Sequence, residues 1–103
     1  MRPIQRLEII IDTLHARTVT EILDRHGVSG WSLLDVVSGR GERGLRRDDD
    51  ISGSSSNQLV LSTASPEQLE PLLDELRPVL QRFGGVCMVS QAMWLRHRTP
   101  PVE

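Results

Sequence analysis

The sequence predicts an α+β domain in which two β-α-β units are joined by a long polar segment. Three observations indicate this class: apolar residues alternate in four short stretches, they recur at helical spacing in two longer stretches, and residues 38–58 show neither pattern. A chain of 103 residues has the length of one domain. We therefore expect one domain over residues 1–98, with residues 99–103 as a loose tail.

The first β-α-β unit begins near the N-terminus. Residues 4–11 alternate apolar and charged side chains, which is typical of a half-buried strand. Residues 14–26 then place their apolar side chains on one helical face, and Gly27 can supply the left-handed stop. Residues 31–37 alternate again, which predicts the second strand of the unit.

The second unit is predicted to run from residue 59 to residue 95, with strands at 59–63 and 86–95. Its helix starts at Ser65-Pro66-Glu67-Gln68, which combines an N-cap serine, a proline at the first helical position and a capping-box glutamine. The helix is expected to end at Gly84-Gly85. Two prolines within it each remove a backbone donor, so we expect kinks there: Pro71 and Pro78.

The segment 38–58 between the two units is rich in glycine, serine and charged residues. A segment of this length without regular structure is uncommon in a compact domain, and where it occurs it is usually functional or disordered. Its apolar content is too low for it to fold alone. We therefore interpret residues 38–58 as a flexible loop that a ligand or partner would order.

This order of elements favours a ferredoxin-like βαββαβ sandwich, in which two helices cover one face of an antiparallel sheet. Strand side chains alternate between the two faces of a sheet, so the strands' large apolar residues cannot all point at the helices. These residues are Trp31, Leu34, Val36, Met88 and Met93. The sequence therefore predicts an apolar open face and oligomerisation through the sheet.

The charged residues exclude several kinds of site. The twelve basic residues are all arginine, so neither Schiff-base chemistry nor a phosphate-binding loop with lysine is available. A net charge of -2 argues against nucleic-acid binding. The apolar run at residues 9–11 is too short for a signal sequence or a membrane span. We expect a cytoplasmic protein that does not insert into membranes.

No catalytic or metal-binding constellation is evident. Cys87 is the only cysteine and lies among apolar residues of a predicted strand, so we interpret it as a core residue. His15 and His26 are eleven residues apart on one predicted helix, about 16 Å along its axis, which is too far for both to hold one metal ion. The acidic run at residues 48–50 is typical of a solvated loop. We therefore predict no enzyme activity and no metal.

Two segments instead indicate anion binding. In residues 38–44 (SGRGERG), glycines allow close approach of the backbone to a ligand and the arginines add positive charge. Arg96 and Arg98 alternate along an extended chain, so both guanidinium groups are expected to point to one side and to converge on a phosphate-sized target.

Together these segments resemble the PII signal-transduction superfamily over nearly the whole chain. The likeness lies in Gly27-x-x-Gly30-x-Ser32, in Gly39-Arg40-Gly41 at the start of the long loop, in Gly84-Gly85-Val86 and in Arg96-x-Arg98. The resemblance implies a homotrimer that binds adenine nucleotides in the clefts between subunits. It also implies the residues of the nucleotide site: Gly30, Ser32, Gly39, Arg40, Gly41, Gly85, Val86, Arg96 and Arg98.

The chain departs from the nitrogen-signalling members of that family at three points. Gly85 stands where those members have a lysine that holds the terminal phosphates, so ADP or AMP is favoured over ATP. Their T-loop tyrosine has no counterpart in a chain without tyrosine. Glu42 and Arg43 replace the glutamine that helps them to bind magnesium and 2-oxoglutarate.

The remaining likeness is to PII-like proteins associated with carboxysomes and inorganic carbon, which bind ADP or AMP together with bicarbonate. That resemblance implies bicarbonate as a second ligand, held by candidate residues Arg40, Arg43 and Arg46. It also implies a target protein, which residues 38–58 would contact, with a membrane transporter among the candidates, and association with the carboxysome. Two alternatives stay open: an ACT-like module that senses small molecules, and a structural trimer without a nucleotide.

Overall fold

The computed structural model describes residues 1–36, 38–41, 44–47 and 56–96. Six strands and two α-helices follow one another along this part of the chain, and a short 3-10 helix (Thr13–His15) precedes α1. The strands and helices are β1 (Arg2–Asp12), α1 (Ala16–Arg25), β2 (Trp31–Val36), β3 (Ser38–Gly41), β4 (Gly44–Arg47), β5 (Asn57–Ala64), α2 (Pro66–Phe83) and β6 (Val86–Trp94).

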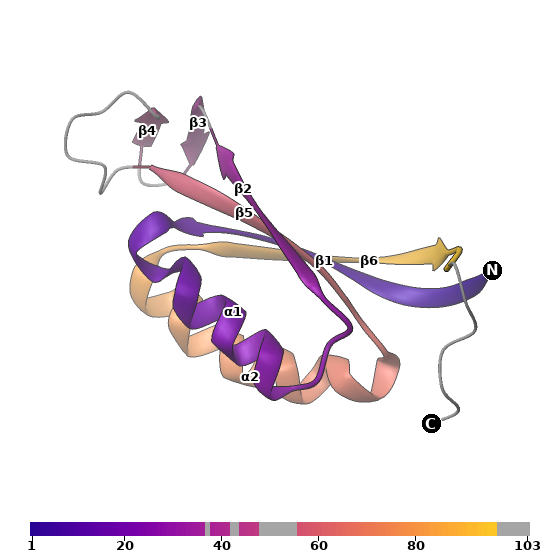
Figure 1. The fold of residues 1–103 in the computed structure, drawn as a ribbon. Helices are drawn as coiled ribbons and strands as arrows, with labels where there is room; N and C mark the ends of the chain where they lie inside the picture. The colour runs from indigo at the N-terminus through magenta and orange to yellow at the C-terminus, as the bar shows by residue number, and fades with distance from the viewer. Residues whose placement is uncertain (37, 42–43, 48–55, 97–103) are drawn as a thin grey trace.

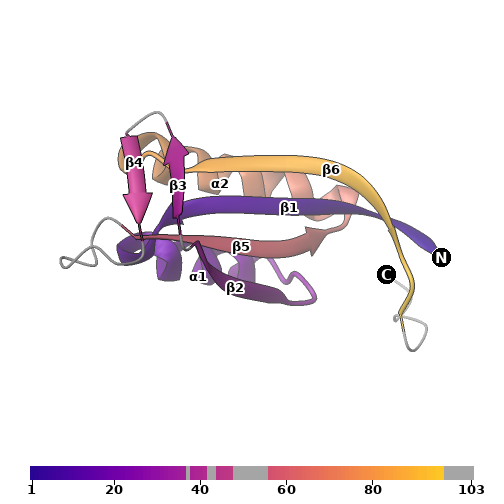
Figure 2. The same ribbon diagram turned by 90° about the horizontal axis from the view of Figure 1, so that it is seen from above.

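Strands β2, β5, β1 and β6 form one antiparallel sheet in that order. Both α-helices lie on the same face of it, and the opposite face carries none (Figure 1). Figure 2 shows the four strands side by side, with β6 curving at its C-terminal end. The predicted ferredoxin-like βαββαβ architecture is therefore confirmed, with element boundaries within a few residues of those expected.

The hydrophobic core lies between this sheet and the two helices. Alternate residues of β1 point to the helices and are buried almost completely, because a half-buried strand directs every second side chain to one face. The largest fully buried side chains are Leu7, Ile9, Ile11, Val19, Leu23, Val60, Leu72 and Leu76. This core fixes the register of the sheet, since a shift by one residue would expose it.

Helix α2 begins and ends as its sequence predicts. The Ser65 hydroxyl accepts a hydrogen bond from the Gln68 backbone N–H, and the Gln68 side chain accepts one from the Ser65 N–H, which is a complete capping box. Gly84 adopts the left-handed conformation (φ 83°) at the other end. The helix continues as one element through Pro71 and Pro78, and both prolines lie on its exposed surface.

The prediction that residues 38–58 lack regular structure is wrong for part of this segment. β3 and β4 pair as a two-stranded antiparallel hairpin, and β5 already begins at Asn57. Hairpin pairing depends on backbone hydrogen bonds that need no apolar alternation, so a glycine-rich hairpin has no periodic signal in its sequence. The hairpin continues from the end of β2, away from the helices (Figure 1). Residues 42–43 and 48–55, also within the predicted loop, lie outside the described residues, as does the predicted tail at 99–103.

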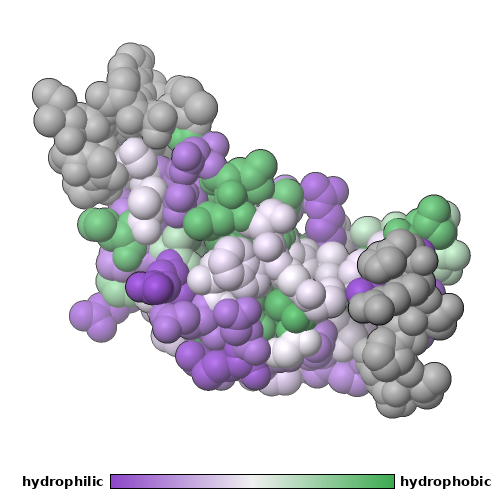
Figure 3. Space-filling view, in the orientation of Figure 1, coloured by the Kyte–Doolittle hydropathy of each residue, from purple (hydrophilic) through white to green (hydrophobic). Residues whose placement is uncertain are grey.

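The face of the sheet opposite the helices carries many apolar side chains. The register aligns Leu34 with Leu59 and Ile10, and Ile10 with Val86, so these residues alternate with those that contact the helices. Leu34, Val86 and Met88 are each between two fifths and about half exposed. Figure 3 shows hydrophilic residues over the helices and green patches on the sheet side above them.

Two of the five residues that raised the expectation of an apolar open face lie elsewhere. Trp31 is on the helix side of β2, where its indole N–H donates to the Asp24 carboxylate of α1 (2.9 Å). Met93 follows the same alternation as the helix-facing residues of β6, and it is 55 % exposed. The open face therefore keeps Leu34, Val36 and Met88 of the original set.

Candidate functional site

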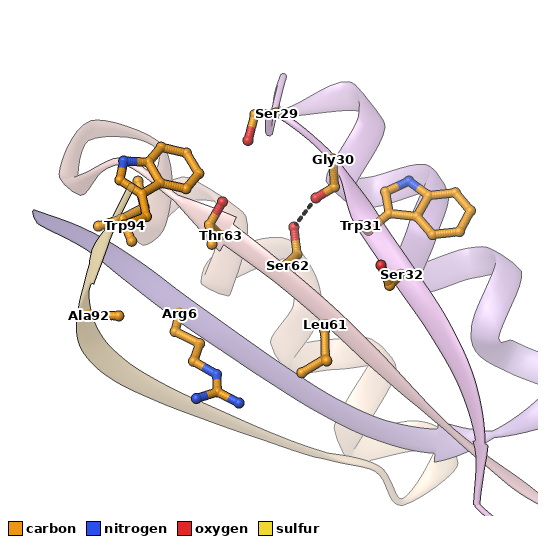
Figure 4. Close-up of a pocket in the computed structure, with 11 residues that line it drawn as sticks. Arg6, Ser29, Gly30, Trp31, Ser32, Leu61, Ser62, Thr63, Ala92 and Trp94 are labelled. Atoms are coloured by element: carbon orange, nitrogen blue, oxygen red, sulfur yellow. Dashed lines mark hydrogen bonds between the residues drawn. The ribbon is translucent and has the colours of Figure 1, made fainter. Parts of the chain in front are cut away.

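A hollow of about 470 Å³ lies on the open face of the sheet, between the start of β2 and the curved end of β6 (Figure 4). Its floor consists of side chains from β1 and β5, and its two walls come from residues 29–32 and from β6. Figure 4 shows Trp94 on one wall, with Ser29 and Gly30 across the gap and Arg6 on the floor. The lining residues are Ile4, Arg6, Ser29, Gly30, Trp31, Ser32, Leu61, Ser62, Thr63, Ala92 and Trp94.

Hydrogen bonds from two neighbouring elements fix the turn that carries Gly30. The Ser62 hydroxyl of β5 donates to the Gly30 carbonyl (2.7 Å, Figure 4). The Gln68 side-chain amide donates to the carbonyls of His26 and Gly27 (3.2 and 2.9 Å). Gln68 therefore closes the capping box of α2 and also holds the turn from α1 to β2, which gives the wall of the hollow a defined position.

The turn is tied to α2 at a second point. Glu75 accepts from Arg25 (2.6 Å) and lies 2.8 Å from the Nε2 atom of His26, so the C-terminal end of α1 is bonded to the middle of α2. The hydrogen bond from Arg25, followed by that from His26, lowers the pKa of the Glu75 carboxyl below its ordinary value. Gln68 and Glu75 thus both join the end of α1 and the turn after it to α2.

The predicted site residues Gly30 and Ser32 both lie at this hollow. No atom of the described residues lies within 4 Å of the place where a Cβ of Gly30 would stand, so its backbone is open to a ligand. Ser32 is exposed on β2, and its side chain has no hydrogen-bond partner among the described residues. Both residues are therefore available to a molecule that enters from the open face.

A second hollow of about 310 Å³ adjoins the first and contains the predicted residue Arg96. Ile4, Ser29, Thr63 and Trp94 line both hollows, so the two are continuous. The second one is more polar. Its additional lining residues are Arg2, Pro3, Gly27, Ala64, Ser65, Pro66, Glu67, Gln68 and Arg96. The two adjoining hollows thus contain the exposed backbone of Gly30, the hydroxyl group of Ser32 and the guanidinium group of Arg96.

The other predicted site residues lie at the opposite end of the sheet. Gly85 and Val86 precede or begin β6, whereas Arg96 follows it. β6 has nine residues, so at about 3.3 Å per residue it separates Gly85 from Arg96 by about 30 Å. Gly39, Arg40 and Gly41 lie in β3, beyond the end of β2 that is remote from Gly30. Within one chain, no nucleotide can touch both groups.

The hairpin carries four of the predicted nucleotide- or bicarbonate-binding residues: Gly39, Arg40, Gly41 and Arg46. The register pairs Gly39 with Arg46, Arg40 with Leu45 and Gly41 with Gly44. Arg43 and Arg98, which belong to the predicted bicarbonate and nucleotide sites, lie outside the described residues.

Gly85 has a packing role that its sequence motif does not reveal. A Cβ at this position would stand 2.8 Å from the backbone carbonyl oxygen of Ile10 and 2.8 Å from Leu80. The chain needs a residue without a side chain here so that α2 and β6 can pack closely against β1. Gly85 therefore meets a steric requirement of the packing in this chain.

Sequence reasoning missed Arg2, Arg6 and Trp94 as residues of the two hollows. Arg6 lies on the open face, where it forms an ion pair with Glu8 (3.3 Å). Trp94 lies two residues before Arg96, a spacing that favours the same side of an extended chain and could have indicated their contact. The position of Arg2 depends on the pairing of β1 with β6, which no local pattern predicts.

The described residues give no sign of catalytic chemistry. The Cys87 side chain is half-buried, and its burial raises the pKa of the thiol, which disfavours the nucleophilic thiolate. Among the residues that the structure describes, no three histidine, cysteine or acidic side chains are grouped so that they could hold a metal ion. No helix in the described part of the chain is both long and apolar enough to cross a membrane.

Known structures resemble this fold over most of its length. A CPII protein from Thiomonas intermedia K12, described as a nitrogen regulatory PII-like protein bound to ADP, AMP and bicarbonate, is 27 % identical with a TM-score of 0.80, and the match covers 87 % of this chain and 86 % of that one. A structure of CPII bound to ADP, AMP and acetate is 28 % identical with a TM-score of 0.77, covering 92 % and 91 % of the two chains.

A more distant relative shares the fold alone. It is a PII-like signalling protein from Thermus thermophilus, 18 % identical, with a TM-score of 0.74 over 88 % of each chain. No curated protein sequence is significantly similar to this chain.

The sequence itself carries the signature of one family. The family described as Nitrogen regulatory protein P-II matches residues 4–99, which is nearly the whole chain and includes every element of the fold except the first two residues of β1. The chain belongs to the nitrogen regulatory protein P-II family and, by its likeness to CPII, to the PII-like branch.

Proposed function

We propose that this chain is a non-enzymatic regulatory protein that binds an adenine nucleotide between neighbouring copies of itself. The nucleotide is ADP or AMP in preference to ATP. One copy contributes Gly30, Ser32 and Arg96, and its neighbour contributes the opposite end of the sheet, from Gly39 to Gly41 together with Gly85 and Val86. Arg98 acts beside Arg96.

The division of the site residues into two distant groups is the observation that carries this proposal. Each group has residues suited to phosphate or base recognition, but β6 keeps the two about 30 Å apart in one chain. Two copies in a closed ring bring the end of one sheet against the opposite end of the next. The apolar open face supplies the surface that such a ring would bury.

The apolar face and the continuous hollows suit the two halves of a nucleotide. Leu61 and Ala92 offer apolar surface for a base beside Gly30 and Ser32. Arg2 and Arg96 line the adjoining hollow and offer charged donors for phosphate oxygens. CPII, which has a similar fold, is bound to ADP and AMP in both structures described above.

Bicarbonate is the proposed second ligand. It is a small planar anion like the acetate in one CPII structure, and arginine donates to such anions with two parallel N–H groups. Arg40, Arg43 and Arg46 are the proposed donors. We further propose that ligand binding changes how residues 38–58 meet a target protein, in the regulation of inorganic carbon at the carboxysome, within the cytoplasm.

Calorimetric titration tests this function. We expect ADP and AMP to bind more tightly than ATP, and we expect bicarbonate to change the ADP affinity by about fivefold or more, since coupled sites typically interact by that factor. The Arg96→Ala/Arg98→Ala variant is expected to lose adenine-nucleotide binding. Arg77→Ala is the matched control, because Arg77 lies on the exposed surface of α2 and pairs only with Asp74 among the described residues.

Each result has a distinct meaning. If the wild-type chain binds no adenine nucleotide, the nucleotide function itself is contradicted. Equal ADP affinity with and without bicarbonate would exclude coupling of the two ligands and leave the nucleotide site standing.

A further inference from the structure

Arg96 is held by an aromatic contact and by no carboxylate among the described residues. Its guanidinium carbon lies 4.7 Å from the centre of the Trp94 ring, within the range of a cation–π contact. Within the part of the chain that the structure describes, it forms no ion pair and no hydrogen bond. Arg96 therefore has a defined resting position while its N–H donors stay unoccupied by this part of the chain.

Trp94 occupies the place where the two hollows meet. It lines the apolar hollow with Gly30 and Ser32 and the polar hollow with Arg2 and Arg96. In Figure 4 its indole stands on the opposite wall from Ser29 and Gly30. A side chain at this boundary can orient a neighbouring group toward the shared space without closing either hollow.

The geometry of the two groups suits such a role. A guanidinium group that stacks on a ring uses its flat face, whereas its five N–H donors point outward in its own plane. Stacking on Trp94 therefore leaves the donors free for phosphate oxygens. It also restricts a long side chain that would otherwise lose rotamer freedom when it binds a ligand.

We propose that Trp94 is a positioning residue for Arg96: its indole holds the guanidinium at the boundary of the two hollows, ready to bind the phosphate of the nucleotide. The inference rests on the proposed nucleotide function and deepens it, because it assigns a role to a residue outside the glycine and arginine motifs. Trp94 acts through Arg96, so its contribution exists only for ligands that carry a phosphate.

The test compares ADP and adenosine binding by calorimetry in five forms of the full chain. These are the wild type, Trp94→Leu, Trp94→Phe, Arg96→Ala and the Trp94→Leu/Arg96→Ala double variant. We expect Trp94→Leu to bind ADP about threefold to tenfold more weakly, the range of a cation–π contact. Adenosine affinity should change by less than about twofold, and Trp94→Phe should restore most of the ADP affinity, since phenylalanine keeps a ring for the guanidinium.

The double variant separates positioning from direct contact. Once Arg96 is absent, loss of Trp94 should have no further effect on ADP affinity, because both changes remove the same interaction. Thermal unfolding of each variant checks that folding is intact. Trp94→Met serves as the test if Trp94→Leu fails to fold, with the same threefold to tenfold weaker ADP binding expected, because methionine also lacks a ring for the guanidinium.

Three results would overturn the inference. Equal weakening of ADP and adenosine by Trp94→Leu would mean that the indole stacks on the base instead. Additive losses in the double variant would mean that Trp94 acts independently of Arg96. Unchanged ADP affinity in Trp94→Leu would remove the role altogether, while the wild type's own binding of ADP would still support the nucleotide function. A wild-type chain that binds no ADP would overturn both.

Discussion

At the scale of single residues, two glycines of the predicted nucleotide site, Gly30 and Gly85, have opposite surroundings. The contrast distinguishes a glycine that packing requires from one that packing does not require. A Cβ at Gly30 would meet open space, whereas a Cβ at Gly85 would meet the Ile10 carbonyl oxygen at 2.8 Å. Of these two positions, packing requires glycine only at Gly85. The presence of glycine at Gly30 is therefore consistent with a ligand that approaches the backbone there.

Gly30→Ala is expected to weaken ADP binding and to leave stability nearly unchanged. The added methyl group touches none of the described residues, and this glycine does not have a positive φ. It would stand where we propose the nucleotide to lie, so we expect about tenfold weaker binding or more, which corresponds to about 1.4 kcal/mol. Calorimetry with ADP and thermal unfolding measure the two effects. An unchanged ADP affinity would remove Gly30 from the site.

Gly85→Ala is the comparison variant. Its methyl group must displace backbone or Leu80, and overpacking of this kind costs about 1–3 kcal/mol of unfolding free energy. Urea unfolding measures the cost. Stability equal to that of the wild type would contradict the packing role of Gly85.

At the scale of elements, helix signals in the sequence predicted more than strand signals did. Ser65 and Gln68 fix the start of α2 by contacts within four residues, so a local pattern contains the whole cause. The hairpin of β3 and β4 escaped prediction because its register depends on the backbone alone. Trp31 lies on the helix side of β2, where it is opposite Ser62 of β5 and donates to Asp24 of α1, and no local pattern predicts either contact.

The contact between α1 and α2 should make stability depend on pH through Glu75. Hydrogen bonds from Arg25 and then His26 lower its pKa in the folded state, so the stabilisation is present above the ordinary pKa of 4.5 and is lost as pH falls through the folded-state pKa. We expect Glu75→Gln to be less stable than the wild type at about pH 7, with the difference shrinking toward about pH 3. Urea unfolding at a series of pH values measures this.

Glu70→Gln is the matched control for that series. Glu70 is exposed on the same helix and has no ion-pair partner among the described residues. Its substitution should change stability little at any pH. A Glu75→Gln difference that stays constant across the whole pH series would show that the charge of Glu75 contributes nothing.

At the scale of the whole molecule, the sequence predicted the architecture but not the distribution of the site. The order of elements and the apolar open face follow from periodicity. The separation of Gly85 from Arg96 depends on the length of β6 and its pairing with β1. The presence of Gly30 and Arg96 in adjoining hollows depends on the order of the strands in the sheet. These are contacts between distant parts of the chain, and no local motif contains them.

Met88→Glu should disrupt oligomers formed through the open face. Met88 is 51 % exposed on this face, and a carboxylate buried there without a partner would be strongly unfavourable. We expect sedimentation velocity to give a trimer for the wild type and a smaller species for the variant. Leu14→Glu is the control, since Leu14 is 67 % exposed in the 3-10 helix before α1. A monomeric wild type would contradict assembly through this face.

Complementation between two defective chains tests the shared site most directly. Arg96→Glu disables one end of the sheet and Arg40→Glu the other, so neither variant alone should bind ADP. When the two are unfolded together and refolded as a mixture, a neighbouring pair can combine two intact ends, and random closed rings should regain about a quarter of the wild-type ADP sites. No regained binding, with rings formed from both variants, would contradict a nucleotide site built from two copies of this chain.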